Sequence, residues 1–317
     1  MAPIPAAHVR REAAAESGLH SVDPARQLPE LRRVMSRSDA ENFPVALRFL
    51  RSDHRTDLEA VYGFARLVDD VGDEAPGDRT ALLDLVGEEL RAAFLGRAGH
   101  PVFVRLQPTI RRRALAPEPF EALLEANRRD QTVHRYATFE DLVGYCRLSA
   151  DPVGHLVLAV FGSDTARNRR WSDAVCTGLQ LAEHWQDVGE DAGRGRIYVP
   201  IEDLEAAGCR EEDLLAGASP SPEVRLLMAR LVGRTRAILD QGLPLLRSLR
   251  GRPRLAVAAY VGGGRAALAA LAAAGYDSLS SSPRATHRAR AAATASAVRD
   301  AFAPRSFGGG HADRRAP

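Results

Sequence analysis

The sequence has no lysine, only 3 cysteines, and aromatic residues that make up 6% of its 317 residues. All 43 basic residues are arginine, and 41 acidic residues leave a net charge of +2. A charge this near zero argues against nucleic-acid binding. The cysteines are odd in number and lack metal-ligand spacing, so neither a disulfide framework nor a zinc site is indicated. Free thiols suit a reducing cytosol, and we therefore predict a cytoplasmic protein.

Long apolar runs are also missing. The N-terminal segment lacks the apolar core of about 7–15 residues that a signal peptide needs. Residues 156–161 form a short apolar run, and the run that begins at Leu255 stops at Arg265. A membrane-spanning helix needs ~20 apolar residues. We therefore expect no membrane span, while peripheral contact with a membrane surface stays open.

Strand signals are nearly absent, and helical periodicity recurs instead. Residues 78–96 place an apolar row behind Asp78, a favourable N-cap, and Ser221 should cap a second helix over 222–242. Further helices are predicted at 27–36, 43–51, 55–73, 118–130, 139–147, 151–161, 168–190 and 253–275.

The chain is predicted to form one all-α domain over residues 21–303, because composition does not change within it. Residues 1–20 and 304–317 are small, polar and rich in Gly or Arg. Such segments bury too little apolar surface to fold, so we expect two disordered tails.

The segment 66-RLVDDVGDE-74 carries four carboxylates within six residues at the end of an apolar helix. Asp69 and Asp73 are four residues apart and share a face, where like charges cost about 0.2–0.5 kcal/mol per pair. The helix dipole disfavours each anion there by a further ~0.3–1 kcal/mol. A bound cation would offset both penalties.

A second acidic row, Glu183, Asp187 and Asp191, has i, i+4, i+8 spacing. One acidic helix end is usually a solvated surface, but two such rows favour a metal site. Mg²⁺ typically takes one or two carboxylates together with substrate phosphate oxygens. We predict that the rows face each other across a helical bundle and hold Mg²⁺ around a diphosphate. The spacing fits neither an EF-hand nor a di-iron bundle.

Polar residues accompany both rows. Arg66 and Tyr62 share the face of Asp69, so the guanidinium is placed to bind phosphate. The alternatives are an ordinary ion pair of Arg66 with Asp69 or Asp70, and a core role for Tyr62. The polar residues around the second row are Gln180, Arg196 and Tyr198.

These motifs resemble the squalene/phytoene synthase family, the head-to-head branch of the isoprenyl synthases. The resemblance covers roughly residues 35–300, and the two Asp motifs about 115 residues apart are its most specific feature. Segments 41–50 and 145–154 look most like the hydroxysqualene synthase branch of bacterial hopanoid pathways. The other matching segments are 62–74, 180–200 and 275–284.

The resemblance implies an all-α isoprenoid synthase bundle with a central cavity and Mg²⁺ between two walls. It puts Asp69 and Asp73 on one wall and Asp187 and Asp191 on the other, with Glu183 as a further ligand. It implies reacting-end or substrate-binding roles for Tyr62, Arg66, Tyr145, Gln180, Phe43, Arg196, Tyr198 and Arg284.

The activity implied is conversion of presqualene diphosphate to hydroxysqualene. Mg²⁺ assists ionisation of the diphosphate, and water captures the carbocation inside an apolar cavity. The Gly triplet at 262–264 follows no strand, so no dinucleotide loop is indicated. Alternatives are a condensing synthase that makes presqualene diphosphate or phytoene, and a degenerate helical scaffold. Expected partners are a prenyl diphosphate, neighbouring pathway enzymes and a membrane surface, but no nucleic acid.

The sequence departs from the family pattern at several positions. Glu183 and Asp151 each stand where Asn is usual. Ser281 and Ser282 replace expected basic residues, for which Arg284 or Arg288 would have to compensate. Elsewhere, we interpret the basic run 111–113 as solvated surface, and His184 as pointing away from Glu183 by about 100° on its helix.

Overall fold

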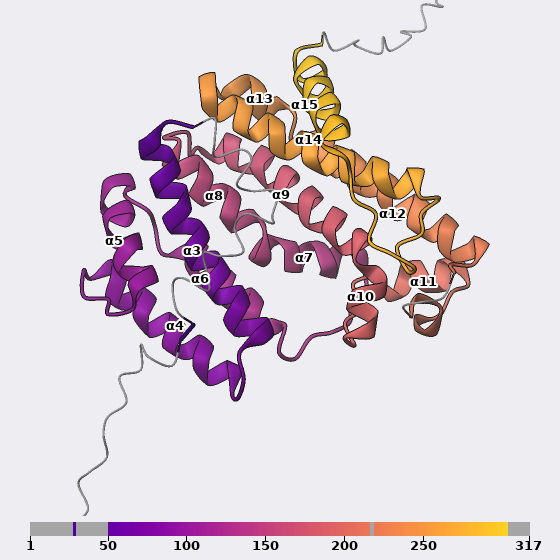
Figure 1. Ribbon diagram of the computed structural model, residues 1–317, viewed down its shortest axis with the longest axis horizontal. Helices are drawn as coiled ribbons and strands as arrows, with labels where there is room; N and C mark the ends of the chain where they lie inside the picture. The colour runs from indigo at the N-terminus through magenta and orange to yellow at the C-terminus, as the bar shows by residue number, and fades with distance from the viewer. Residues whose placement is uncertain (1–27, 30–49, 216–218, 304–317) are drawn as a thin grey trace, which may run out of the picture.

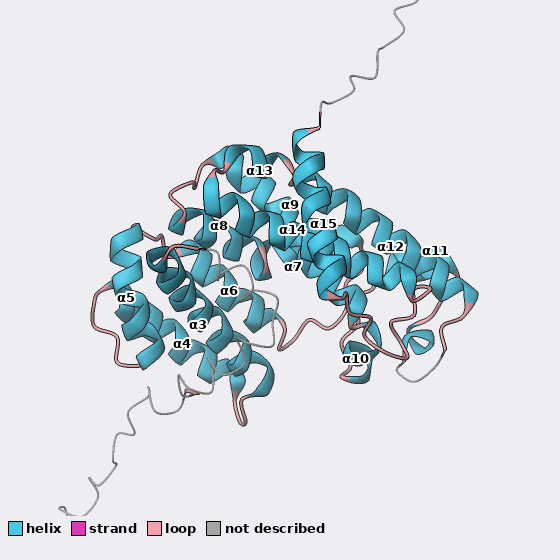
Figure 2. Ribbon diagram, turned by 45° about the horizontal axis from the view of Figure 1, so that its top comes forward, coloured by secondary structure: helices cyan, strands magenta, loops and turns pink. Residues whose placement is uncertain are grey.

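The structure is a computed structural model that describes residues 28–29, 50–215 and 219–303. These ranges contain helices and no β-strand, which confirms the all-α prediction (Figure 2). All three cysteines are free. The predictions for helices at 27–36 and 43–51, for Phe43 and for both tails fall mainly or wholly outside the described residues. The domain boundaries at 21 and 303 therefore stay predictions.

The first half of the described chain contains α3 (Ser52–Glu74), α4 (Arg79–Phe94), α5 (Pro101–Arg113), α6 (Glu118–Arg129), α7 (Phe139–Ser149) and α8 (Asp151–Val160). The second half contains α9 (Ala166–Gln186), α10 (Val188–Gly193), α11 (Ile201–Ala207), the 3-10 helix η3 (Glu211–Leu214), α12 (Pro222–Gln241), α13 (Pro244–Ser248), α14 (Gly251–Ala273) and α15 (His287–Phe302).

Side-chain caps start two helices where the sequence predicts them. The Asp78 carboxylate accepts a hydrogen bond from the Ala81 amide at 3.0 Å, and the Ser221 hydroxyl accepts one from the Val224 amide at 3.2 Å. Each cap satisfies a backbone donor that the first turn leaves without an intrahelical partner. The apolar rows that follow then set which face of each helix is buried.

Two apolar clusters form the main core. One cluster lies among helices α3, α4, α5 and α6. In it, Phe64 contacts Phe103 and Phe120 edge to face, at centroid distances of 5.8 and 5.0 Å. The other surrounds α9, which packs against α7, α8, α12 and α14. Figure 1 shows α3, α4 and α5 on one side, α12, α14 and α15 on the other, and α9 between them. The helix ends that carry the acidic motifs lie between the two groups.

The predicted helix over 168–190 is interrupted, which corrects the predicted i, i+4, i+8 row. Asp187, with φ −109° and ψ 15°, separates α9 from α10. The Gly189 amide donates to the Ser278 carbonyl at 3.2 Å, and a Cβ on Gly189 would lie 2.8 Å from the Leu279 carbonyl oxygen. The chain near residue 278 thus packs directly on the break, where only glycine fits.

Within the described residues, α14 is long and apolar enough, by length and composition alone, to cross a membrane. However, 56% of that apolar stretch is buried within the protein, as in the core helix of a globular domain. Arg265, which interrupts the apolar run in the sequence, is buried within α14. Its guanidinium pairs with Asp240 and Asp300, each at 2.7 Å, so its charge is compensated internally.

Arg111 and Arg112 are exposed, as the interpretation of residues 111–113 as solvated surface predicts, but Arg113 is half-buried. Arg112 and Arg113, at the end of α5, form ion pairs with the buried Asp57 of α3. Their charges therefore hold two helices together.

Candidate active site

The first acidic row ends α3, and its carboxylates have different partners. Asp69 accepts a hydrogen bond from the Asn127 amide at 3.3 Å. The buried Asp70 pairs with Arg66 at 2.9 Å, which is the ordinary ion pair allowed as an alternative in the sequence. Asp73 pairs with the Arg196 guanidinium at 2.8 Å. The row is thus split between an internal ion pair at Asp70, a contact of Asp69 with α6, and a contact of Asp73 with the second motif.

The Arg196–Asp73 pair brings the two motifs together, although 123 positions separate them in the chain. Arg196 is held in place because its backbone amide donates to the Asp191 carbonyl at 2.9 Å. Burial alone would lower the pKa of Arg196, but the hydrogen bond and charge of Asp73 raise it. Arg196 therefore stays cationic between carboxylates from both motifs.

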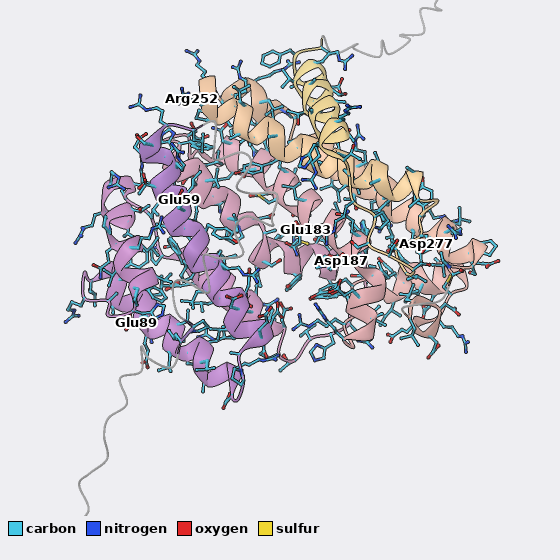
Figure 3. All side chains as sticks on the ribbon, in the orientation of Figure 1. Glu59, Glu89, Glu183, Asp187, Arg252 and Asp277 are labelled. Atoms are coloured by element: carbon cyan, nitrogen blue, oxygen red, sulfur yellow. The ribbon has the colours of Figure 1, made fainter. Side chains whose placement is uncertain are left out.

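The second row lies where α9 ends and α10 begins, as Figure 3 shows for Glu183 and Asp187. Glu183 is exposed one turn before the break. The Asp187 carboxylate accepts a hydrogen bond from the Ser282 hydroxyl at 2.7 Å. Burial, together with the charge of Asp187, raises the pKa of Asp191 to about 7. The carboxylates of Asp187 and Asp191 thus repel each other at a partly buried position.

This donor set fits a hard divalent cation. A cation would relieve the repulsion that raises the pKa of Asp191, and carboxylate oxygens are ligands that Mg²⁺ prefers. No group of three or more His, Cys, Asp or Glu side chains in the described chain is close enough to hold one ion. The acidic side chains of the described residues therefore do not by themselves form a metal site with three or more protein ligands.

An aromatic group lies beside the acidic rows. The Tyr198 ring stacks on His184 with centroids 3.8 Å apart, and Tyr145 lies 6.0 Å from Tyr198. Burial lowers the pKa of His184 to about 3, so the imidazole is neutral at physiological pH. His184, Tyr198 and Asp191 line one small pocket. His184 is buried whereas Glu183 is exposed, which agrees with its predicted direction away from Glu183, and it lies beside Asp191 instead.

The remaining predicted residues lie around this group or outside the described chain. Gln180 lies within 3.4 Å of the His184 ring nitrogen. Tyr62 is one turn before Arg66 on α3 and is half-buried. Arg284 is exposed just after Ser282, the residue that contacts Asp187. Phe43 lies outside the described residues, so its placement near the substrate stays a prediction.

Asp130, which follows α6, is a site residue that the sequence patterns did not predict. The Tyr145 hydroxyl donates to the Asp130 carboxylate at 2.7 Å. Burial raises the pKa of Asp130 to about 6, although the Tyr145 hydrogen bond and the charge of Arg196 oppose the rise. Asp130 belongs to no acidic row and follows two arginines, so the sequence alone carries no signal for it.

Comparisons with known proteins show which family the sequence resembles. The sequence matches the family described as squalene/phytoene synthase over residues 36–291. It is 38% identical to the hydroxysqualene synthase of Rhodopseudomonas palustris over 218 residues, which cover 68% of this chain and 73% of that protein. It is 34% identical to the phytoene synthase of Arthrospira platensis over 203 residues, or 59% and 66% of the two chains.

Two solved structures also match. The squalene synthase HpnC from Alicyclobacillus acidocaldarius is 45% identical, with a TM-score of 0.72 over 80% of this chain and 99% of that one. A dehydrosqualene synthase in complex with ligand is 20% identical, with a TM-score of 0.76 over 85% and 94% of the two chains. The second match supports the fold alone.

Proposed function

Because this chain belongs to the squalene/phytoene synthase family and is an enzyme similar to hydroxysqualene synthases, we propose that it converts presqualene diphosphate into hydroxysqualene. Enzymes of this family act on prenyl diphosphates and typically use Mg²⁺. The observation that carries the proposal is the convergence of both acidic motifs through Arg196, next to a small pocket lined by His184, Tyr198 and mainly aliphatic side chains.

The proposed metal ligands are Asp69 and Asp73 from α3, and Asp187 and Asp191 around the helix break, with Glu183 as a further candidate. Bound Mg²⁺ would neutralise the leaving diphosphate and so favour breakage of its C–O bond. A carboxylate that binds a cation must be deprotonated, so binding would also lower the raised pKa of Asp191.

Two arginines are positioned to bind the diphosphate. Arg196 lies between the acidic motifs, and Arg66 lies one turn before Asp70 on α3. A guanidinium can donate two parallel hydrogen bonds to phosphate oxygens. Each already pairs with a carboxylate, Arg66 with Asp70 and Arg196 with Asp73, and Arg196 is the stronger candidate because its pair links the two acidic motifs. Arg284 would approach from the chain beyond Ser282.

The described groups suit protection of a carbocation better than attack on it. His184 is neutral because burial lowers its pKa, and burial raises the pKa of Tyr145 well above its ordinary value. The Tyr145 phenol therefore stays protonated and is a weak nucleophile, while the neutral His184 ring is stacked on Tyr198. The rings of Tyr145 and Tyr198 offer π faces, which stabilise a nearby cation. Water would then be the group that captures the cation, with Tyr62 and Gln180 at the reacting end.

Identity to phytoene synthases supports a second candidate, a condensing reaction of two prenyl diphosphates. The purified protein should be supplied with Mg²⁺ and, separately, presqualene diphosphate or farnesyl diphosphate, and the products extracted. We expect hydroxysqualene from the first substrate and no turnover after chelation of Mg²⁺. If the protein consumes farnesyl diphosphate and leaves presqualene diphosphate intact, the condensing reaction is supported and the proposed conversion to hydroxysqualene is contradicted.

A matched pair of variants tests the acidic site. Asp187→Asn should abolish most turnover, whereas Glu190→Gln removes an exposed carboxylate that pairs with Arg194 and should have little effect. Equal activity of the two variants would contradict the metal-binding role. Contact with a membrane surface or with pathway enzymes stays a prediction that follows from the apolar substrate and product.

A further inference from the structure

The partly buried Asp130 and the buried Tyr145 form a hydrogen-bonded pair next to the candidate active site. The Tyr145 hydroxyl donates to the Asp130 carboxylate at 2.7 Å. Tyr145 comes from the middle of α7, whereas Asp130 is the residue that ends α6. The pair therefore links two helices at a point where the ring of Tyr145 already contacts Tyr136 and Tyr198.

The proton of this pair stays on the phenol. Burial and the charge of Asp130 raise the pKa of Tyr145 well above its ordinary value. Burial also raises the pKa of Asp130, to about 6, so at neutral pH the carboxylate is the acceptor and the phenol is the donor. Because a hydroxyl has one hydrogen and two lone pairs, donation to Asp130 leaves only lone pairs for any other neighbour of the Tyr145 oxygen.

We propose that Asp130 is a positioning residue that holds the Tyr145 phenol as an oriented dipole, with the hydrogen toward Asp130 and the oxygen lone pairs toward the reacting carbons. This inference rests on the proposed function, because it assumes that Tyr145 lines the reacting end. An oriented oxygen stabilises a developing positive charge, or accepts a hydrogen bond from the attacking water. Tyr145 neither gains nor loses a proton in this role. A preoriented dipole needs no reorganisation during the reaction, which is how fixed donors and acceptors lower barriers.

A purely structural role is the competing explanation, since the same hydrogen bond also fastens α6 to α7. A double-mutant cycle separates the two roles. Asp130→Ala, Tyr145→Phe and the double variant are compared in the full-length protein by steady-state release of diphosphate with Mg²⁺, together with the thermal midpoint of each protein. Asp84→Asn is the matched control, because it removes an exposed carboxylate that pairs with Arg128, two residues before Asp130.

We expect Asp130→Ala to lower kcat by roughly 10- to 100-fold, since one hydrogen bond to a charged acceptor is lost. The KM should change little, because the interaction acts in the transition state. The double variant should be no slower than the slower single variant, because Asp130 acts through Tyr145. Asp130→Asn keeps an acceptor oxygen and should retain more activity than Asp130→Ala.

Three results would overturn the inference: losses that multiply in the double variant, an unchanged kcat in Asp130→Ala, or a rise in KM alone. If Asp130→Ala does not fold, Asp130→Asn with Tyr145→Phe completes the same cycle. The assay uses whichever prenyl diphosphate the wild-type protein consumes. Failure with presqualene diphosphate would therefore contradict the proposed function, while the cycle could still be measured with farnesyl diphosphate.

Discussion

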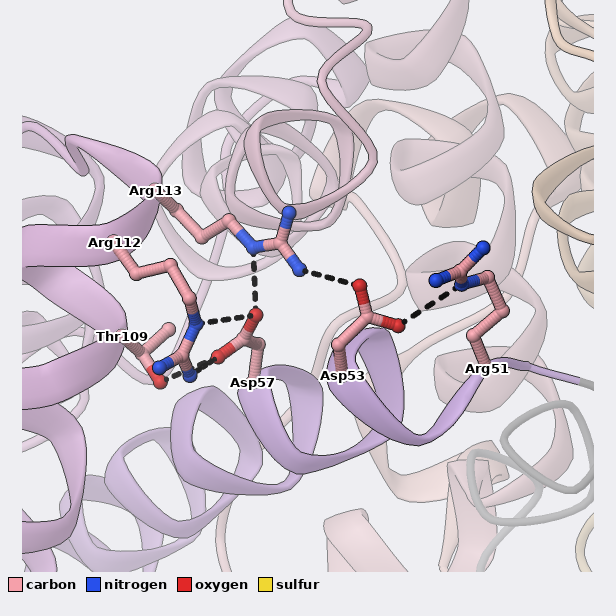
Figure 4. Close-up of polar contacts among 6 residues, drawn as sticks. All are labelled: Arg51, Asp53, Asp57, Thr109, Arg112 and Arg113. Atoms are coloured by element: carbon pink, nitrogen blue, oxygen red, sulfur yellow. Dashed lines mark hydrogen bonds and ion pairs between the residues drawn. The ribbon is translucent and has the colours of Figure 1, made fainter.

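Asp57 is the residue whose loss should destabilise the fold most clearly. Its carboxylate is 0% exposed on α3 and accepts a hydrogen bond from the Thr109 hydroxyl at 2.9 Å. Arg113 donates to it at 2.6 Å, and Arg112 forms a further ion pair (Figure 4). We therefore expect Asp57→Asn, which removes the negative charge and keeps the shape, to leave two cations without a counter-charge.

The magnitude follows from how exposed those cations are. Breaking a fully buried ion pair costs about 3–5 kcal/mol. The Arg112 side chain is 47% exposed and that of Arg113 is 19% exposed, so both can turn partly toward water. We therefore expect a loss of about 2–4 kcal/mol, less than the fully buried case. In a large domain each kcal/mol shifts the Tm by about 2–4 °C, which predicts a drop of roughly 4–16 °C.

Asp53→Asn is the matched control, measured by the same thermal unfolding at pH 7. Asp53 lies in the same network, 3.5 Å from Arg113 and 3.4 Å from Arg51, but its side chain is 44% exposed. An exposed ion pair contributes about 0–1 kcal/mol, so the Tm should move by at most about 4 °C and by less than in Asp57→Asn. The reasoning is refuted if Asp57→Asn and Asp53→Asn shift the Tm equally.

The remaining predictions use similar pairs of measurements. Burial would raise the pKa of Asp57, but its arginine and threonine partners hold that pKa below the ordinary value. The stability that this carboxylate contributes should therefore be lost as the pH falls below about 4. The difference in Tm between the wild-type protein and Asp57→Asn should then disappear. Gly262→Ala would place a Cβ 2.6 Å from the Thr294 backbone and should cost about 1–3 kcal/mol, whereas Gly263→Ala meets nothing within 4 Å and should be neutral or stabilising in chemical denaturation. Arg196→Gln should slow diphosphate release by roughly 10-fold or more through loss of a charged hydrogen-bond donor, whereas Arg194→Gln should keep wild-type rates.

Helices with local signals were predictable from the sequence, and those without were not. The caps Asp78 and Ser221 act through residues three positions away, so their effect is visible in sequence. Helix α5 was missed because Pro101 and Pro108 look like helix breakers, although Pro101 occupies the favourable first position. Helix α15 was missed because its buried contacts are mostly alanine, which gives no apolar stripe.

The acidic site was predictable only as far as its motifs extend. Spacing identified both rows, but the break at Asp187 depends on residues near 278 that pack on it from far along the chain. Ser282 looked like the loss of a basic residue, yet its hydroxyl binds Asp187. Asp130 could not be predicted from the sequence, because its role depends on Tyr145, fifteen positions away on another helix. Contacts made by single residues across the fold leave no periodic trace.

Asp57 and Asp73 lie on the same helix, about 24 Å apart at 1.5 Å per residue, and illustrate two uses of a carboxylate. Asp57 is fully buried with arginines supplied by a neighbouring helix, whereas the Asp73 side chain is 49% exposed with one arginine from the second motif. A half-exposed ion pair contributes at most about 1 kcal/mol, so Asp73→Asn should leave the Tm within a few degrees while turnover falls sharply. Asp57→Asn should instead lower the Tm strongly while the turnover of the folded protein changes little. If both variants instead lose stability and activity in parallel, Asp73 is a structural residue and the metal-binding assignment on α3 fails.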